Sequence, residues 1–154
     1  MAGIGAASGL WPLVKLMNPS AKVLVTSTVE VNLSGIQEGH GVKVKWQGIP
    51  VFIRRRTKQE IEAARAVNLK SLMDPQLDEQ RVYEGKDEWG IWTHLGCVPI
   101  DNATKDGNGW FCPCHDSYYD TSGRVIGGPA PKNMVVPDYF YFPSENVVVI
   151  GKKA

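Results

Sequence analysis

Two short stretches of this 154-residue chain concentrate the side chains that bind transition metals. Residues 92–97 read WTHLGC, and residues 112–120 read CPCHDSYYD. Together they hold all three cysteines and two of the three histidines: Cys97, Cys112, Cys114, His94 and His115. Thiolates and imidazoles are soft or borderline ligands that suit iron or zinc. The pattern favours a metal centre over the alternative, a disulfide accompanied by unrelated surface histidines.

The odd number of cysteines leaves two arrangements open. Three cysteines can form one disulfide and leave one thiolate for another task, or all three can bind a metal. Composition and charge describe an ordinary globular domain, because hydrophobic residues make up 43% and charged residues 21%. Lys and Arg number 17 against 16 Asp and Glu, so the charge gives no support for nucleic-acid binding.

The N-terminal segment predicts a membrane anchor. Residues 1–14 are uncharged and rich in Gly and Ala, although they are fewer than the roughly 20 needed to cross a bilayer. We interpret them as the outer half of an anchor helix rather than a terminal loop, with Trp11 near the interface. Pro19 pushes Asn18 out of the helical region. We therefore expect an anchor over 1–17, a hinge over 18–25 and a head over 26–154.

The sequence of the head predicts mostly antiparallel β-structure. Residues 42–46 alternate in polarity and residues 50–53 follow a turn, which is typical of a hairpin. Further strands are expected at 22–25, 29–33, 135–136, 139–142 and 147–150. The run Arg54-Arg55-Arg56 is interpreted as a solvated strand end.

One helix is predicted, followed by a polar segment. Thr57 and Glu60 have the spacing of a capping box, and the helix should run to about Val67. Residues 68–82 lack strong periodicity, which indicates a surface excursion. The sequence GGPAP at 127–131 predicts a rigid loop that closes over a site, because proline fixes φ and glycine permits close backbone approach.

Over nearly its whole length the chain resembles the Rieske iron–sulfur proteins of cytochrome bc complexes (ubiquinol–cytochrome c reductase, respiratory complex III). The matching stretches are MNPS at 17–20, VFIRRRT at 51–57, THLGCVP at 93–99, WFCPCH at 110–115, YDTSGR at 119–124 and GPAP at 128–131. The resemblance implies a Rieske-like β-sandwich with inserted cluster-binding loops, here about residues 91–135, and a [2Fe–2S] cluster.

In that family two cysteines hold one iron and two histidines hold the other, which raises the reduction potential. Carried over by position, the resemblance makes His94, Cys112 and His115 ligands. It pairs Cys97 with Cys114 in a disulfide that clamps the two loops, as suits an oxidising compartment.

The resemblance also assigns residues around the cluster. Ser117 and Tyr119 match hydroxyls that hydrogen-bond the cluster sulfurs, and Gly128 and Pro129 match cofactor-binding positions. His115 would face ubiquinol and accept its hydrogen bond and proton.

The chain departs from the family pattern at the site itself. Trp92 occupies the fourth ligand position, and an indole N–H is a donor that cannot bind iron. Asp116 replaces a glycine, Tyr118 stands where histidine is usual, and the strand before residue 92 is several apolar residues short. Cys97 could supply the missing ligand only by abandoning the disulfide. Zn²⁺ bound by the three cysteines and one histidine is a further alternative under reducing conditions.

Two functions remain open from the sequence. The first is a redox-active Rieske subunit that passes electrons from ubiquinol to cytochrome c1. The second is a clusterless structural subunit of the same or a related complex. Either implies cytochrome b and cytochrome c1 as partners in a dimeric complex, in the mitochondrial inner membrane or the bacterial cytoplasmic membrane, with the head in the intermembrane space or periplasm.

Overall fold

The computed structural model describes residues 27–151. The expected anchor (1–17), the expected hinge (18–25) and the strand expected at 22–25 lie outside the described residues. Within residues 27–151, no helix has the length and apolar character needed to cross a membrane.

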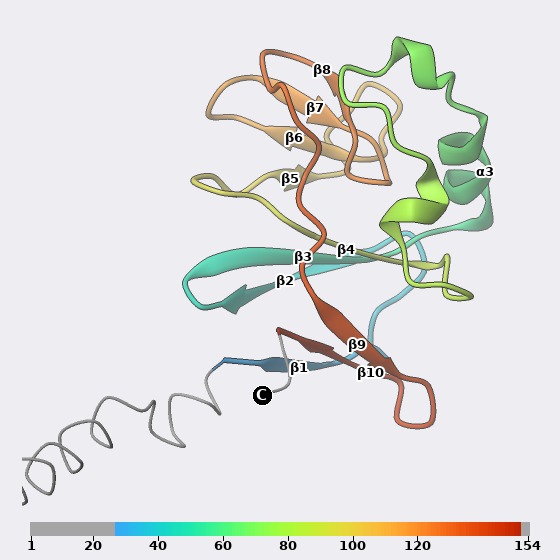
Figure 1. Ribbon diagram of the computed structural model, residues 1–154, viewed down its shortest axis with the longest axis vertical. Coiled ribbons are helices and arrows are strands. Elements are labelled where there is room, and N and C mark those ends of the chain that lie inside the picture. The colour runs from blue at the N-terminus through green and yellow to red at the C-terminus, as the bar shows by residue number, and fades with distance from the viewer. Residues whose placement is uncertain (1–26, 152–154) are drawn as a thin grey trace, which may run out of the picture.

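Three antiparallel sheets follow one another along the long axis of the head (Figure 1). The first has the order β1-β10-β9, from β1 (Val29–Asn32), β10 (Val147–Ile150) and β9 (Tyr139–Phe142). The second is β2-β3-β4, from β2 (Gly41–Trp46), β3 (Ile49–Arg55) and β4 (Trp89–Thr93). The third is β5-β6-β7-β8, from β5 (Ile100–Asp101), β6 (Trp110–Cys112), β7 (Ser117–Tyr119) and β8 (Val125–Gly127).

These sheets confirm the predicted fold class, mainly antiparallel β with one α-helix in the described part of the chain. The predicted hairpin is β2-β3, in which Val44 pairs with Val51. The strand expected at 135–136 is wrong, because Val135 makes only an isolated bridge to Thr93.

Two hydrophobic cores share strands β3 and β4. One core fills the space between the first two sheets and includes Ile53, Ile91 and Val148, each at most 1% exposed. The other lies under the third sheet and includes Phe52 and Trp92. Side chains alternate across a strand, so Ile53 and Ile91 serve the first core while Phe52 and Trp92 serve the second. The strand pair β3-β4 thus positions the third sheet and its loops.

Helix α3 (Lys58–Ala66) begins at the predicted capping box. The Glu60 N–H donates to Thr57 Oγ1 at 3.1 Å, and the Thr57 N–H donates to Glu60 Oε2 at 3.2 Å. Both bonds satisfy helix-end donors that have no partner inside the helix.

Replacing Thr57 by alanine should lower the free energy of unfolding by about 1 kcal/mol, because one capping acceptor is lost. Thermal unfolding followed by circular dichroism measures the change. Thr57→Ser keeps the hydroxyl and serves as the control. Equal stability of Thr57→Ala and the parent chain would contradict the capping role.

The expectation that residues 54–56 form a solvated strand end is wrong. Arg54 and Arg56 are each 1% exposed. Arg54 pairs with Glu60 at 2.6 Å and with Asp101 at 2.5 Å. A run of three arginines resembles a solvated strand end in sequence, because the carboxylates that neutralise Arg54 come from helix α3 and from Asp101, 47 residues further along the chain.

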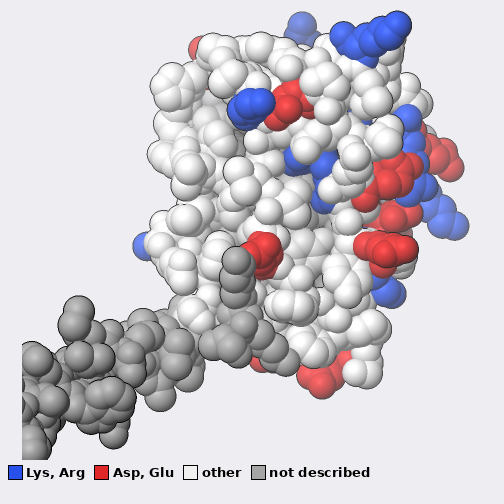
Figure 2. Space-filling model, viewed as in Figure 1, with Lys and Arg blue, Asp and Glu red and all other residues white. Residues whose placement is uncertain are grey.

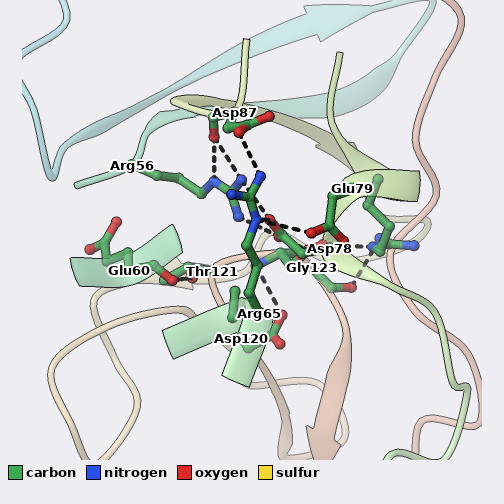
Figure 3. Close-up of polar contacts among 12 residues, drawn as sticks. Arg56, Glu60, Arg65, Asp78, Glu79, Asp87, Asp120, Thr121 and Gly123 are labelled. Atoms are coloured by element: carbon green, nitrogen blue, oxygen red, sulfur yellow. Dashed lines mark hydrogen bonds and ion pairs between the residues drawn. The ribbon is translucent and has the colours of Figure 1, made fainter. Parts of the chain in front are cut away.

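The expected surface excursion at 68–82 is also wrong in part. It contains two short 3₁₀ helices, Leu69–Ser71 and Asp78–Arg81, and the second is buried at Asp78 and Arg81. Asp78 binds Arg56 at 2.6 Å (Figure 3). It also accepts a hydrogen bond from the Ser122 hydroxyl at 2.7 Å. Arg81 donates to the carbonyl of Met134 at 2.6 Å. This network ties the segment to the third sheet.

Charged side chains of both signs gather beside α3 and the segment that follows it (Figure 2). On the face drawn, basic and acidic groups are interspersed. The arrangement agrees with the near-balanced composition of 17 basic and 16 acidic residues, and offers no basic stripe for nucleic acid on that face.

Candidate metal centre

The two cysteine-containing stretches meet at the end of the third sheet. The first continues from β4, and the second forms the turn between β6 and β7. A disulfide joins Cys97 to Cys114 with 6.4 Å between their Cα atoms, inside the normal range for such a bridge. The disulfide implied by the resemblance is therefore confirmed, and it clamps the two loops together.

A pocket of about 280 Å³ opens beside this bridge. It is lined by His94, Cys112, His115, Ser117, Tyr119, Pro129, Ala130 and Pro131. The structure thus brings together the three expected ligands, both expected hydroxyls and the predicted proline loop. Gly128 does not line this pocket, although its neighbour Pro129 does.

His94 and Cys112 already face one another. His94 Nε2 lies 3.2 Å from Cys112 Sγ, and Cys112 is a buried free thiol. Burial, and secondarily the charge of His115, lower the pKa of His94 below its usual value. The imidazole is therefore neutral at neutral pH, the state in which histidine binds a metal. His115 is exposed at the pocket rim.

Ser117 and Tyr119 line one side of the pocket, and the proline loop contacts Ser117 there. Ser117 is 2% exposed, and its Oγ accepts a hydrogen bond from the Ala130 N–H at 3.2 Å. Tyr119 is 1% exposed and packs edge-on against the His94 ring at 5.6 Å. Burial, and then the neighbouring Cys112, raise the pKa of Tyr119, so its hydroxyl keeps its proton and remains a donor.

Gly128 contributes to the site through its backbone conformation. Its φ is +87°, and an added Cβ would overlap the backbone of Asp116 and Ser117. Only glycine permits this close approach without strain. The residue therefore sets the position of the loop that carries Pro129.

Trp92 does not enter the pocket. Its side chain is fully buried at 0% exposure, and its ring meets Trp110 edge-on with the centroids 6.1 Å apart. An added Cβ at Gly90 would overlap the Trp92 ring, and one at Gly123 would approach it to 2.8 Å. The indole thus lies between two glycines, and its N–H has no hydrogen-bond partner among the described residues.

Sequence reasoning missed these two glycines. A signal for one of them was present, because Gly90 lies two residues before Trp92 and therefore on the same face of β4. The closeness of Gly123, 31 positions further along, followed only from the fold.

The other departures near the site have separate local explanations. Asp116 has a φ of +53°, in the left-handed region that glycine adopts freely and aspartate tolerates better than most residues. Tyr118 pairs across the hairpin with Phe111, with ring centroids 4.9 Å apart. It lies on the opposite face of β7 from the pocket.

A Rieske cluster needs two cysteines and two histidines, and the pocket supplies one cysteine with His94 and His115. Trp92, which the resemblance puts at the fourth ligand position, is an apolar ring buried in the core. The residues present therefore do not fit a [2Fe–2S] cluster with its ordinary ligands.

Known proteins similar to this chain point to one family. Residues 90–140 match the Rieske [2Fe-2S] domain family. The name of the family refers to the cluster for which this pocket supplies only three of the four ordinary ligands. The ubiquinol-cytochrome c reductase iron-sulfur subunit of Rickettsia prowazekii is 52% identical over 96% of this chain and 85% of its own length. The subunit of the same name from Bradyrhizobium diazoefficiens is 50% identical over 97% of this chain and 87% of its own length.

A mitochondrial relative and a solved structure extend the comparison. The mitochondrial cytochrome b-c1 complex subunit Rieske of Neurospora crassa is 52% identical over 96% of this chain and 64% of its own length. A chain of a hyperthermophilic respiratory complex III shares the fold, with a TM-score of 0.57 at 23% identity, covering 94% of this chain and 91% of that one. The chain therefore belongs to the family of Rieske iron–sulfur subunits of ubiquinol–cytochrome c reductase.

Proposed function

We propose that this chain is the Rieske-type subunit of a ubiquinol–cytochrome c reductase and takes part in respiratory electron transfer from ubiquinol to cytochrome c1. The observation that carries this proposal is the collinear similarity of 50–52% to subunits of that name over 96–97% of the chain. The architecture around the pocket supports it, because a disulfide joins the two cysteine-containing loops, and Ser117, Tyr119 and the proline loop line the pocket between them.

The same relatives support a proposal for the partners and the place in the cell. We infer contacts with cytochrome b and cytochrome c1 in a dimeric complex III. The complex would lie in a mitochondrial inner or bacterial cytoplasmic membrane, with the head in the intermembrane space or periplasm. A disulfide between Cys97 and Cys114 suits those oxidising compartments.

Particular residues take proposed roles at the pocket. His94, Cys112 and His115 are the side chains that we propose to bind the iron of a [2Fe–2S] cluster, and Ser117, Tyr119, Gly128 and Pro129 are the cofactor-binding positions. His115 is the exposed histidine of the two that line the pocket, so we assign to it the hydrogen bond from ubiquinol.

A second candidate is a clusterless subunit retained for its packing in the complex. Trp92 favours it, since the fourth ligand position is a buried indole between Gly90 and Gly123. The core beneath the pocket is filled by side chains, and the loops are fixed by a disulfide and by Arg81. We infer that a head held together in this way folds without a cluster.

Electron paramagnetic resonance on the ascorbate-reduced complex, with iron and acid-labile sulfide assayed on the same sample, separates the two candidates. The clusterless candidate predicts no Rieske-type signal and no sulfide in this chain, because one of four ligands is missing, whereas the electron-transfer candidate predicts both. The Rickettsia prowazekii relative, prepared in the same way, is the positive control. Two irons, two sulfides and a Rieske-type signal assigned to this chain would reject the clusterless candidate.

Trp92→Cys alone should not restore normal quinol oxidation in this complex. The exchange supplies a thiol but empties the indole site in the core, and β4 remains only five residues long. Full quinol oxidation by this single variant would show that the strand and core tolerate the cluster, contrary to this expectation.

A further inference from the structure

The three cysteine sulfurs form a cluster that the family's cluster chemistry does not account for. The Sγ atoms of Cys97, Cys112 and Cys114 all lie within 4.8 Å of one another. His94 Nε2 lies 3.2 Å from the sulfur of Cys112. Three sulfurs and one imidazole nitrogen are the donors of a structural Cys₃His zinc site.

We propose that the chain binds one Zn²⁺ through Cys97, Cys112, Cys114 and His94 when its disulfide is reduced. The site and the disulfide are alternative states of the same residues. This proposal is independent of membership in the reductase.

The tryptophan at position 92 explains why the Cys112 thiol is available to bind zinc. In the family pattern a second cysteine at that position would share an iron with Cys112. Here the position holds an indole, and Cys112 remains a free thiol. The other two cysteine sulfurs are the members of the disulfide, and both lie within 4.8 Å of Cys112 Sγ. Reduction of that bridge makes them available as ligands.

The spacing suits a single zinc ion. Zn–S bonds of about 2.3 Å and Zn–N bonds of about 2.0–2.1 Å place tetrahedral donors roughly 3.5–3.8 Å apart. The sulfurs are within 4.8 Å and the His94–Cys112 pair is at 3.2 Å. Reduction lets the bonded sulfurs of Cys97 and Cys114 move from about 2.05 Å apart to the roughly 3.8 Å that zinc requires. Cys114 is exposed and Cys97 half-buried, which leaves both side chains room to move.

His94 rather than His115 is the fourth ligand, because its ring nitrogen already contacts the Cys112 sulfur. It also lies three positions before Cys97 on the same loop, within the short spacings typical of paired zinc ligands. His115 follows Cys114 directly and is exposed. The two histidines therefore offer a matched pair of variants.

The redox chemistry balances with simple reagents. A water-soluble phosphine breaks the S–S bond and takes oxygen from water to become the phosphine oxide, leaving two thiols. Zinc binding then displaces the thiol protons to the buffer. Conversely, oxidised glutathione takes two electrons from the Cys97 and Cys114 thiolates, so that the disulfide forms, two glutathione thiolates leave and Zn²⁺ is released.

The test uses the full chain, reduced by phosphine without oxygen and titrated with Zn²⁺, with bound metal counted by native mass spectrometry. We expect one Zn²⁺ per reduced chain and none on the oxidised chain. Cys112→Ser and His94→Asn should each weaken binding by more than about 100-fold, since losing a direct ligand exceeds the 10- to 100-fold cost of losing a second-shell partner. His115→Asn should bind as tightly as the parent chain.

Cobalt provides a second measurement that needs no variant. Co²⁺ added to the reduced chain should give the absorption bands of a tetrahedral thiolate-rich site, and oxidised glutathione should abolish them while releasing the metal. No metal on the reduced chain, equal binding by the oxidised chain, or binding lost in His115→Asn but kept in His94→Asn would each overturn the proposal.

Discussion

Replacing Trp92 by alanine is expected to lower the free energy of unfolding by about 3–5 kcal/mol, the usual cost of emptying a large aromatic site in a core. The indole is fully buried and packs with Phe52 and Trp110 under the third sheet. Chemical denaturation followed by tryptophan fluorescence and circular dichroism gives the difference. A loss below about 1 kcal/mol would contradict a core role for this ring.

A second variant separates the contribution of the ring volume to stability from that of the indole N–H group. Trp92→Phe keeps much of the apolar volume and removes the unpartnered indole N–H, whose burial costs about 1–3 kcal/mol. We therefore expect this variant to lose far less stability than Trp92→Ala.

Gly90→Ala provides a coupling test of the same packing. An added Cβ overlaps the Trp92 ring, so the substitution should destabilise the parent chain and be tolerated in the Trp92→Ala background. A double-mutant cycle measures this difference. Additive effects would show that the two residues do not contact one another.

Asp78→Ala should be comparably costly, at about 3–5 kcal/mol, because it leaves the Arg56 guanidinium buried without its carboxylate. Both side chains are fully buried, and two hydrogen bonds of 2.6 and 3.1 Å join them. Chemical denaturation measures the loss of stability. Glu79→Ala is the control, since Glu79 is 55% exposed and pairs with Arg65 at the surface, where such a pair contributes about 0–1 kcal/mol.

The same carboxylate should make stability depend on pH. Burial acts to raise the pKa of Asp78, but hydrogen bonds from Arg56 and Ser122 outweigh it and hold the pKa below its usual 3.8. The stabilisation is therefore present above pH 3.8 and is lost as the pH falls through the lower folded-state pKa. Asp78→Ala should lack this part of the acid sensitivity. An unchanged pH profile would contradict the ion pair.

Local signals in the sequence determined much of the fold and part of the site. The β2-β3 hairpin followed from two alternating runs around a turn, and α3 from the reciprocal spacing of Thr57 and Glu60. These features depend on residues only a few positions apart, so the sequence alone is enough to identify them. The metal-binding stretches were equally local, and the disulfide followed from their resemblance to a family in which the same loops are clamped.

Only the tertiary structure decided which polar and aromatic residues are buried. Arg54 and Arg56 resembled a solvated strand end, and the structure buries them because Glu60, Asp78 and Asp101 converge on them from other segments. The sequence excluded Trp92 as a ligand, and the fold determined that its ring fills the core between Gly90 and Gly123 instead of closing the pocket. Burial and charge pairing join residues far apart in the chain, so their outcome depends on packing that no local pattern encodes.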